Sequence, residues 1–202
     1  MIVTDVWRTT CHRALKEKTM HTTFELWQAA PQDPILAPVM QSVFPRDKSP
    51  IVNKYPSGMI ANTDPHDQLG THWVAMYFIS PWESEFFDSY GFPPDTYRMD
   101  GYIERDVARY NNKPFQGLTL DTCGDYCIFY LFHRARNVDM DAIQAKFLSH
   151  DTQWNDAQVA TFVHSYVKSL TSVRQRSPFF QSEQTCKSFK CWRKESIKCC
   201  LK

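Results

Sequence analysis

The segment that most constrains the fold runs from Gln116 to Arg136 and reads QGLTLDTCGDYCIFYLFHRAR. Its middle, residues 127–132, is apolar or aromatic at every position, which predicts a helix buried on most of its sides. The residues before it are polar and irregular, so the helix should begin near Cys123. Such a helix belongs inside the molecule, and the rest of the chain has to fold around it.

The start of this helix suits a nucleophile. We expect Thr122 to be the N-cap, which places Cys123 in the first turn, where backbone N–H groups have no partner within the helix. The positive end of a helix dipole stabilises a thiolate there, and Gly124, which has no Cβ, lets another chain approach the sulfur. Because buried cysteines are usually inert, this interpretation requires a base, a residue that orients the base, and an oxyanion donor elsewhere in the chain.

The composition is that of an ordinary globular protein, but the charge is unevenly distributed. The chain has 202 residues, 43% of them apolar and 22% charged, which predicts one domain with a substantial core. From residue 173 onward there are 8 Lys or Arg and 2 Asp or Glu, a net +6, so the total of +1 leaves −5 on residues 1–172.

The sequence also bears on location and on cysteine chemistry. No apolar run approaches the ~18 residues of a membrane span. The first residues lack the apolar region of a signal peptide, so we expect an intracellular protein. Its seven cysteines are therefore interpreted as thiols rather than as a disulfide framework.

The centre of the expected sheet is a hairpin. Residues 72–79 (HWVAMYFI) are apolar nearly throughout, which predicts a strand covered on both faces. A turn at 81–84 and an antiparallel strand at 85–90 (EFFDSY) complete the hairpin. The remaining patterns predict a short helix or turn at 39–44, a helix at 97–110, a strand at 113–118, a short helix at 140–148 and a longer helix with one apolar face at 154–170.

Within the hairpin, His72 and Asp88 are expected to be neighbours. Both lie at roughly the same distance from the turn near Pro81, so they should be close across the two strands. An acidic residue in an apolar strand is costly unless it is paired, and a carboxylate–imidazole bond would fix the tautomer of the imidazole. A lone histidine at the end of a strand is usually only a polar side chain without a special role. Pairing with Asp88 explains why both a histidine and an aspartate occur in this apolar hairpin.

Gln116 is the available oxyanion donor. It lies seven residues before Cys123, and its amide can act together with the backbone N–H of Cys123. Taken alone, a solvent-facing glutamine is the alternative interpretation. Asp125 and Cys127 are one turn along the helix, where helix capping and core packing explain them better than contact with a cleft.

Three parts are expected along the chain: residues 1–38 without a clear pattern, a peptidase-like domain at 39–172, and a basic tail at 173–202. The tail contains Cys186, Cys191, Cys199 and Cys200. Their spacing does not fit paired zinc ligands, and no histidine follows His164, so we expect a disordered basic tail and neither a metal nor a cofactor.

Ordered motifs carry a family resemblance. They are His72-Trp73, the run Phe-x-Asp-Ser-Tyr-Gly at 86–91, and Gln116-Gly117 followed by Thr122-Cys123-Gly124. Together they resemble the adenovirus-type cysteine endopeptidases (adenain), and more closely the versions encoded by Maverick/Polinton transposons and adintovirus-like elements. The resemblance spans residues 39–170. The same clan includes the SUMO and ubiquitin-like-protein proteases, with the same His–Asp–Gln–Cys order.

The resemblance implies an α+β, papain-like cysteine peptidase whose nucleophile starts a buried helix beside a mixed or antiparallel sheet. It implies that His72 is the general base, Asp88 its orienter, Gln116 the oxyanion donor and Cys123 the nucleophile, with Trp73 and Gly124 contacting substrate. Implied partners are protein substrates, namely virion-like structural precursors, together with an activating peptide or DNA; a nuclear or virion-associated location is implied as well.

This chain departs from the adenoviral pattern in several places. Asp88 stands where adenoviral enzymes have Glu, whereas the SUMO proteases have Asp. No cysteine lies between residues 12 and 122, so disulfide linkage to an activating peptide does not carry over, and the acidic first 172 residues do not favour DNA. Two alternatives to an endopeptidase stay open: a SUMO or ubiquitin-like isopeptidase, and an inactive transposon-derived binding protein.

Overall fold

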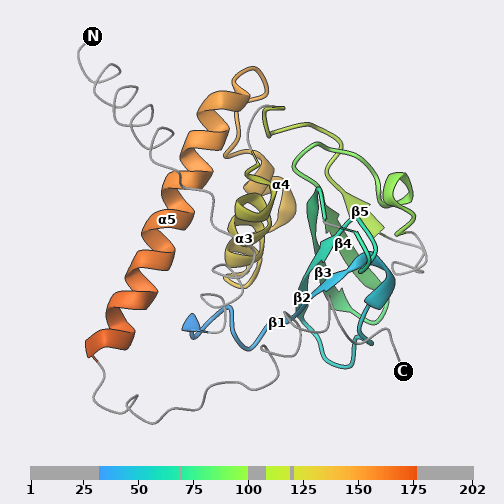
Figure 1. Ribbon diagram of the computed structural model, residues 1–202, viewed down its shortest axis with the longest axis horizontal. Coiled ribbons are helices and arrows are strands. Elements are labelled where there is room, and N and C mark those ends of the chain that lie inside the picture. The colour runs from blue at the N-terminus through green and yellow to red at the C-terminus, as the bar shows by residue number, and fades with distance from the viewer. Residues whose placement is uncertain (1–31, 69, 100–107, 119–120, 177–202) are drawn as a thin grey trace. The chain divides into compact units, whose positions relative to one another are not determined.

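The computed structural model describes residues 32–68, 70–99, 108–118 and 121–176 (Figure 1). Its strands are β1 (Met40–Pro45), β2 (Ser57–Asn62), β3 (Trp73–Ser80), β4 (Glu83–Phe87) and β5 (Ala108–Tyr110). Its helices are α3 (Cys123–Arg134), α4 (Met140–Gln144) and α5 (Thr152–Arg176), with short 3-10 turns η2 (Arg46–Lys48) and η3 (Pro94–Tyr97). The fold thus combines a five-stranded sheet with helices, as the α+β prediction required.

The sheet is mixed and has the predicted hairpin at its centre. Its strands lie in the order β1-β2-β3-β4-β5. The pairs β2·β3 and β3·β4 are antiparallel, whereas the outer pairs β1·β2 and β4·β5 are parallel. Because β3 starts where β4 and β2 end, the chain segments that flank these three strands meet at one end of the sheet.

Strand β3 is covered on both faces, as its continuous apolar sequence predicts. Ala75 and Tyr77 face a core that contains the buried side of α3 and residues of α4 and α5. Val74, Met76 and Phe78 face a second core on the opposite side of the sheet. Loop residues close this second core, among them Met99 and the partly buried Val52 and Tyr55. Because side chains alternate along the strand, β3 contributes residues to two separate cores.

The helix α3 is buried, as predicted from its apolar sequence. Seven consecutive residues, from Asp125 to Leu131, are all buried. In α5 the buried side includes Val159, Val163 and Tyr166, which belong to the apolar face predicted from the sequence. The chain divides into two units, residues 1–170 and 171–202, and α5 continues from the first unit into the second.

Three of the secondary-structure predictions are wrong. Residues 40–45 form strand β1 instead of a helix or turn, because they pair with β2, a partner that local sequence does not reveal. In the predicted helix at 97–110, η3 ends at Tyr97 because Arg98 adopts a left-handed conformation (φ 55°), and residues 108–110 pair with β4. Residues 113–118 form no strand; the N–H groups of Phe115 and Gln116 both donate to the carbonyl of Ser89.

Other predictions fall where the structure gives no description. The pattern of residues 1–31, the tail after residue 176 and its four cysteines lie outside the described residues. Within the part that is described, no helix is long and apolar enough to cross a membrane.

Candidate active site

The four residues expected to carry chemistry come from four different segments that meet at one end of the sheet. His72 directly precedes β3, Asp88 directly follows β4, Gln116 lies in the connection before α3, and Cys123 is the first residue of α3. All four side chains are buried. Burial of three polar side chains requires hydrogen-bond partners for each of them within the protein.

His72 and Asp88 are hydrogen-bonded, but not as directly opposed residues. The imidazole Nε2 lies 2.6 Å from Asp88 Oδ1. In the ladder Ala75 pairs with Phe87, and extending this register by one residue places Asp88 opposite Val74. A further two residues place His72 opposite Tyr90, whose ring stacks on the imidazole. The predicted neighbours are thus diagonal, because Ser80 pairs with Glu83 and the turn is therefore centred after Pro81, beyond the midpoint between His72 and Asp88.

The carboxylate of Asp88 is held by backbone and side-chain donors as well as by the histidine. The N–H groups of Tyr90 and Phe92 donate to its two oxygens at 3.0 and 2.9 Å. The hydroxyl of Tyr97 donates to Oδ2 at 3.0 Å. The backbone N–H of Asp88 donates to the side chain of Asn111 at 2.8 Å. The donors to the two carboxylate oxygens fix the direction of the carboxylate toward His72.

The imidazole of His72 is biased toward its charged form. Burial lowers the pKa of His72, but the hydrogen bonds and charges of Asp88 and Cys123 outweigh it and raise that pKa from 6.5 to about 9. Cys123 contributes to this rise after Asp88, which indicates that the thiol lies near the imidazole. Since Nε2 is engaged by Asp88, Nδ1 is the nitrogen left to face the sulfur.

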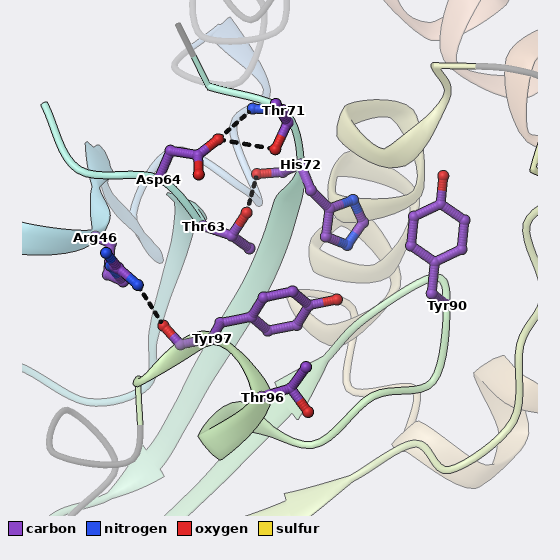
Figure 2. Close-up of a pocket in the computed structure, with 8 residues that line it drawn as sticks. All are labelled: Arg46, Thr63, Asp64, Thr71, His72, Tyr90, Thr96 and Tyr97. Carbon is purple, nitrogen blue, oxygen red and sulfur yellow. Dashed lines mark hydrogen bonds between the residues drawn. The ribbon is translucent and has the colours of Figure 1, made fainter. Parts of the chain in front are cut away.

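Two tyrosine rings hold the imidazole in place (Figure 2). The ring of Tyr90 stacks on it with a centroid separation of 4.7 Å, and the ring of Tyr97 lies 5.6 Å away at a tilt. Neither tyrosine was expected from the sequence to act at the site. Tyr90 lies within the motif at 86–91, whereas Tyr97 fell in a segment predicted to be helical.

The nucleophile helix begins where predicted, but Thr122 does not cap it. Thr122 occupies the N-cap position without a side-chain hydrogen bond to the first turn. Its hydroxyl donates instead to Asp156 Oδ1 at 3.4 Å. A hydrogen bond to α5 therefore replaces the capping interaction. The hydroxyl of Thr122 does not accept a hydrogen bond from the backbone N–H groups beside Cys123.

Asp156 is a buried residue that the sequence interpretation missed. It accepts hydrogen bonds from Gly117 N at 3.1 Å and from Tyr126 Oη at 3.0 Å, in addition to Thr122. Burial raises the pKa of Asp156 to about 6, although these three hydrogen bonds oppose the rise. Asp156 thereby joins the segment that carries Gln116 to the start of α3. Nothing in the local sequence of α5 distinguishes it from a surface carboxylate.

The amide of Gln116 is fixed at both ends. The hydroxyl of Ser89 donates to Oε1 at 2.6 Å, and Nε2 donates to the hydroxyl of Tyr90 at 3.3 Å. Its own backbone N–H donates to the carbonyl of Ser89 at 3.1 Å. The solvent-facing alternative for Gln116 is therefore wrong, since its side chain is buried beside the histidine's stacking partner.

The remaining predicted residues lie around this group. Trp73 is half-buried at the first position of β3 and packs against the core that contains α3. Gly124 is the half-buried second residue of α3. Asp125 and Cys127 are buried, and burial raises the pKa of the Cys127 thiol. Cys127 thus belongs to the core, as core packing predicted.

A cavity of about 390 Å³ opens on one side of the imidazole (Figure 2). Its wall includes His72, the rings of Tyr90 and Tyr97, and the polar side chains of Arg46, Asp64 and Thr71. Asp64 accepts two hydrogen bonds from Thr71, and Arg46 donates to the carbonyl of Tyr97. Cys123 and Gln116 do not line this cavity. Across the described ranges no group of three or more His, Cys, Asp or Glu side chains is arranged to hold a metal ion.

Comparisons with known proteins add one finding about similarity. No protein-family model and no curated protein matches the sequence. Among solved structures, the chain is similar to the ASFV pS273R protease, with 23% sequence identity and a TM-score of 0.36. The similarity covers 55% of this chain and 44% of that one, so the chain spans less than half the length of the protease that it matches.

Proposed function

We propose that the chain is a cysteine endopeptidase that uses Cys123, His72, Asp88 and Gln116. One observation carries the proposal: His72 hydrogen-bonds the carboxylate of Asp88 at 2.6 Å, and Cys123 lies near enough to the same imidazole to raise its pKa together with Asp88. A nucleophile, a base and a residue that orients the base are the parts that acyl transfer by a thiol requires. All three are buried, and Cys123 is the first residue of α3.

The family resemblance supports the same assignment from the sequence. The order His–Asp–Gln–Cys and the flanking motifs resemble adenain and the wider clan of SUMO proteases. By this resemblance, the substrates are virion-like structural precursors, and the sheet with its buried nucleophile helix is a papain-like arrangement. The residue roles are proposed here on the basis of their contacts.

In the first step the thiolate of Cys123 attacks the carbonyl carbon of the scissile peptide. A C–S bond forms, and the electron pair of the carbonyl moves to its oxygen. The backbone N–H of Cys123 and Nε2 of Gln116 are the donors for this oxyanion. Nε2 donates to the hydroxyl of Tyr90 at 3.3 Å, which is longer than the usual N–H···O range, so a charged oxygen can replace this acceptor.

Collapse of the oxyanion then breaks the C–N bond. The imidazolium of His72 transfers its proton to the departing nitrogen, which leaves as an amine, while the acyl group stays on the sulfur. In the second half of the reaction His72 removes a proton from water, and the resulting hydroxide attacks the thioester. The C–S bond breaks, the carboxylic acid leaves and the thiolate is restored.

This chemistry indicates which part of the substrate lies in the cavity. The proton donor His72 must face the leaving amine, so the polypeptide that leaves lies on the imidazole side of the scissile bond. The cavity is lined by His72 and not by Cys123 or Gln116. We therefore assign it to side chains of the leaving segment. Its wall of Arg46, Asp64 and Thr71 suits polar side chains better than large apolar ones.

The test compares two cysteines of the same helix. Cys123→Ala is expected to abolish hydrolysis of a peptide library and to leave the melting temperature nearly unchanged, since a buried sulfur contributes little packing. Cys127→Ala is the matched control: its thiol is buried one turn along in the core, and this variant should keep its activity. Peptide mapping after brief treatment with iodoacetamide below pH 7 should find Cys123 modified faster than Cys127.

His72→Ala provides the second arm of the experiment. Removal of the imidazole should suppress both alkylation of Cys123 and turnover, because the thiolate loses its cationic partner. An unchanged alkylation rate in this variant would contradict the proposal. Cleavage of SUMO or ubiquitin-like conjugates in preference to every library peptide would make the chain an isopeptidase. Absence of both activities would leave the binding-protein alternative.

A further inference from the structure

We infer that Ser89 is a positioning residue that selects which end of the Gln116 amide faces the reacting carbonyl. This inference rests on the proposed function and goes beyond it, because no role was expected for Ser89. The hydroxyl of Ser89 lies 2.6 Å from Oε1 of Gln116, and both side chains are buried. A carboxamide offers a donor at one end and an acceptor at the other, so only one of its two orientations can stabilise an oxyanion.

The lengths of the two side-chain bonds indicate the orientation. An O–H···O bond is typically ~2.5–3.0 Å long, whereas N–H···O bonds are ~2.7–3.2 Å. The bond to Ser89 measures 2.6 Å, which fits an oxygen at that end of the amide. The bond to Tyr90 measures 3.3 Å, which lies just above the N–H···O range but well above the O–H···O range, so the nitrogen is the better assignment at the other end. Ser89 therefore acts as the donor, and the amide N–H groups are turned toward Tyr90 and the imidazole stacked on it.

Ser89 also holds the backbone of Gln116. Its carbonyl accepts the N–H groups of Phe115 at 2.8 Å and of Gln116 at 3.1 Å. A single residue thus fixes the position of the Gln116 main chain through its carbonyl and the direction of the Gln116 amide through its hydroxyl. Loss of the hydroxyl leaves the first function in place and removes only the second.

Three consecutive residues consequently set the geometry between the base and the oxyanion donor. Asp88 binds the imidazole of His72, Ser89 binds the amide of Gln116, and Tyr90 contacts both through its ring and its hydroxyl. The three residues lie in a turn in which the N–H of Gly91 donates to the carbonyl of Asp88 at 2.9 Å, so one short segment keeps the two groups at a constant separation. This is the preorganisation that oxyanion stabilisation requires.

The experiment replaces the hydroxyl and measures kcat and KM separately on the intact chain with a cleaved peptide. Ser89→Ala is expected to lower kcat by about 10- to 100-fold, which is part of the ~10²–10³ that one oxyanion donor contributes. KM should change by less than about twofold, since the ground-state carbonyl depends little on this donor. Alkylation of Cys123 by iodoacetamide should be unchanged, because that reaction forms no oxyanion.

The matched control is Ser84→Ala in strand β4. The hydroxyl of Ser84 is also buried, but it has no hydrogen-bond partner among the described residues. Its removal tests the effect of losing a buried hydroxyl while the orientation of the Gln116 amide is kept. The kcat of this variant should stay within about twofold of that of the intact chain. If Ser89→Ala fails to fold, Ser89→Cys fills similar space with a weaker donor and should show a smaller loss of kcat.

A double variant shows whether Ser89 acts through Gln116. In a Gln116→Ala background, adding Ser89→Ala should reduce kcat no further, because no amide remains to be oriented. Equal losses in both backgrounds, or a kcat of Ser89→Ala within twofold of the intact chain, would overturn the inference while the peptidase assignment stands. Absence of turnover in the intact chain would overturn the assignment itself, and the role of Ser89 with it.

Discussion

At the scale of single residues, the pairing of His72 with Asp88 determines when the imidazole carries a proton. Buried histidines normally lose their proton more easily, yet the pKa of His72 is raised to about 9, chiefly because Asp88 and Cys123 outweigh the effect of burial. Under the proposed mechanism, the imidazolium must donate a proton to the leaving amine. Activity should therefore persist through neutral pH and fall as the pH rises through about 9.

Neutralising the carboxylate should move this alkaline limit. In Asp88→Asn the largest contribution that raises the pKa of His72 is removed, so the pKa falls and activity is lost at a lower pH. The measurement is the pH profile of kcat/KM. Asp95→Asn, which neutralises an exposed carboxylate of η3, is the control and should leave the limit in place. An alkaline limit that is identical in Asp88→Asn would show that another group sets it.

At the scale of elements, Asp156 links α5 to the start of α3. The hydroxyl of Tyr126 lies 3.0 Å from the carbonyl of Phe115 and 3.0 Å from Asp156, and its single proton can serve only one of them. The same carboxyl oxygen, Asp156 Oδ1, also accepts the hydroxyl of Thr122 at 3.4 Å. Burial raises the pKa of Asp156 to about 6 and so favours its neutral form, although these hydrogen bonds oppose the rise.

This link makes the stability depend on pH in an unusual direction for a carboxyl group. A carboxyl group whose pKa is raised from 3.8 to about 6 in the folded protein stabilises the folded state fully below pH 3.8. This stabilisation is lost as the pH rises through about 6. We expect the free energy of unfolding of the intact chain, minus that of Asp156→Asn, to fall by roughly 2 kcal/mol between pH 4 and pH 7. Urea titrations at several pH values measure it, and a difference that rises with pH would contradict the assignment.

The cavity beside His72 belongs to the same scale, because residues following β1, β2 and β4 form its wall. Arg46 forms no ion pair with a carboxylate of the described residues, whereas Asp64 is occupied by Thr71. If the leaving segment enters this cavity, Arg46→Ala should reduce the preference for acidic side chains there by up to about 10-fold. Alkylation of Cys123 should be unaffected. Equal preferences in both proteins would place the leaving segment elsewhere.

At the scale of the whole molecule, one buried carboxylate connects distant parts of the chain. Asp33 accepts hydrogen bonds from Arg136 at 2.8 Å and from Tyr166 at 2.9 Å, which follow it by 103 and 133 residues. It also accepts the N–H groups of Ile35 and Leu36. Although burial alone would raise it, the pKa of Asp33 is lowered by these hydrogen bonds, with Arg136 the largest contributor among them.

Removal of this carboxylate should destabilise the fold. We expect Asp33→Ala to lower the free energy of unfolding by about 2–4 kcal/mol, since it leaves buried donors without an acceptor. Asp47→Ala removes a more exposed carboxylate paired with His66 and should have little effect. Denaturant unfolding at neutral pH compares the two variants. Equal losses would show that burial at Asp33 does not determine the effect.

The sequence by itself determined the elements whose signals are local. The apolar run after Cys123 predicted a buried helix, the run at 72–79 predicted a strand covered on both faces, and the turn near Pro81 brought His72 and Asp88 close together. Each of these follows from periodicity and turn chemistry within about 20 residues, where chain connectivity limits the alternatives. The motifs also pointed to Gln116, although they did not indicate how its amide is held.

Tertiary structure alone decided the features that depend on distant partners. Residues 40–45 are a strand because β2 pairs with them, and Thr122 leaves its capping role because Asp156 accepts its hydroxyl. The direction of the Gln116 amide depends on Ser89, which precedes it by 27 residues. A hydrogen bond between separate segments depends on where each segment lies in the fold, and the local sequence of neither partner carries that information.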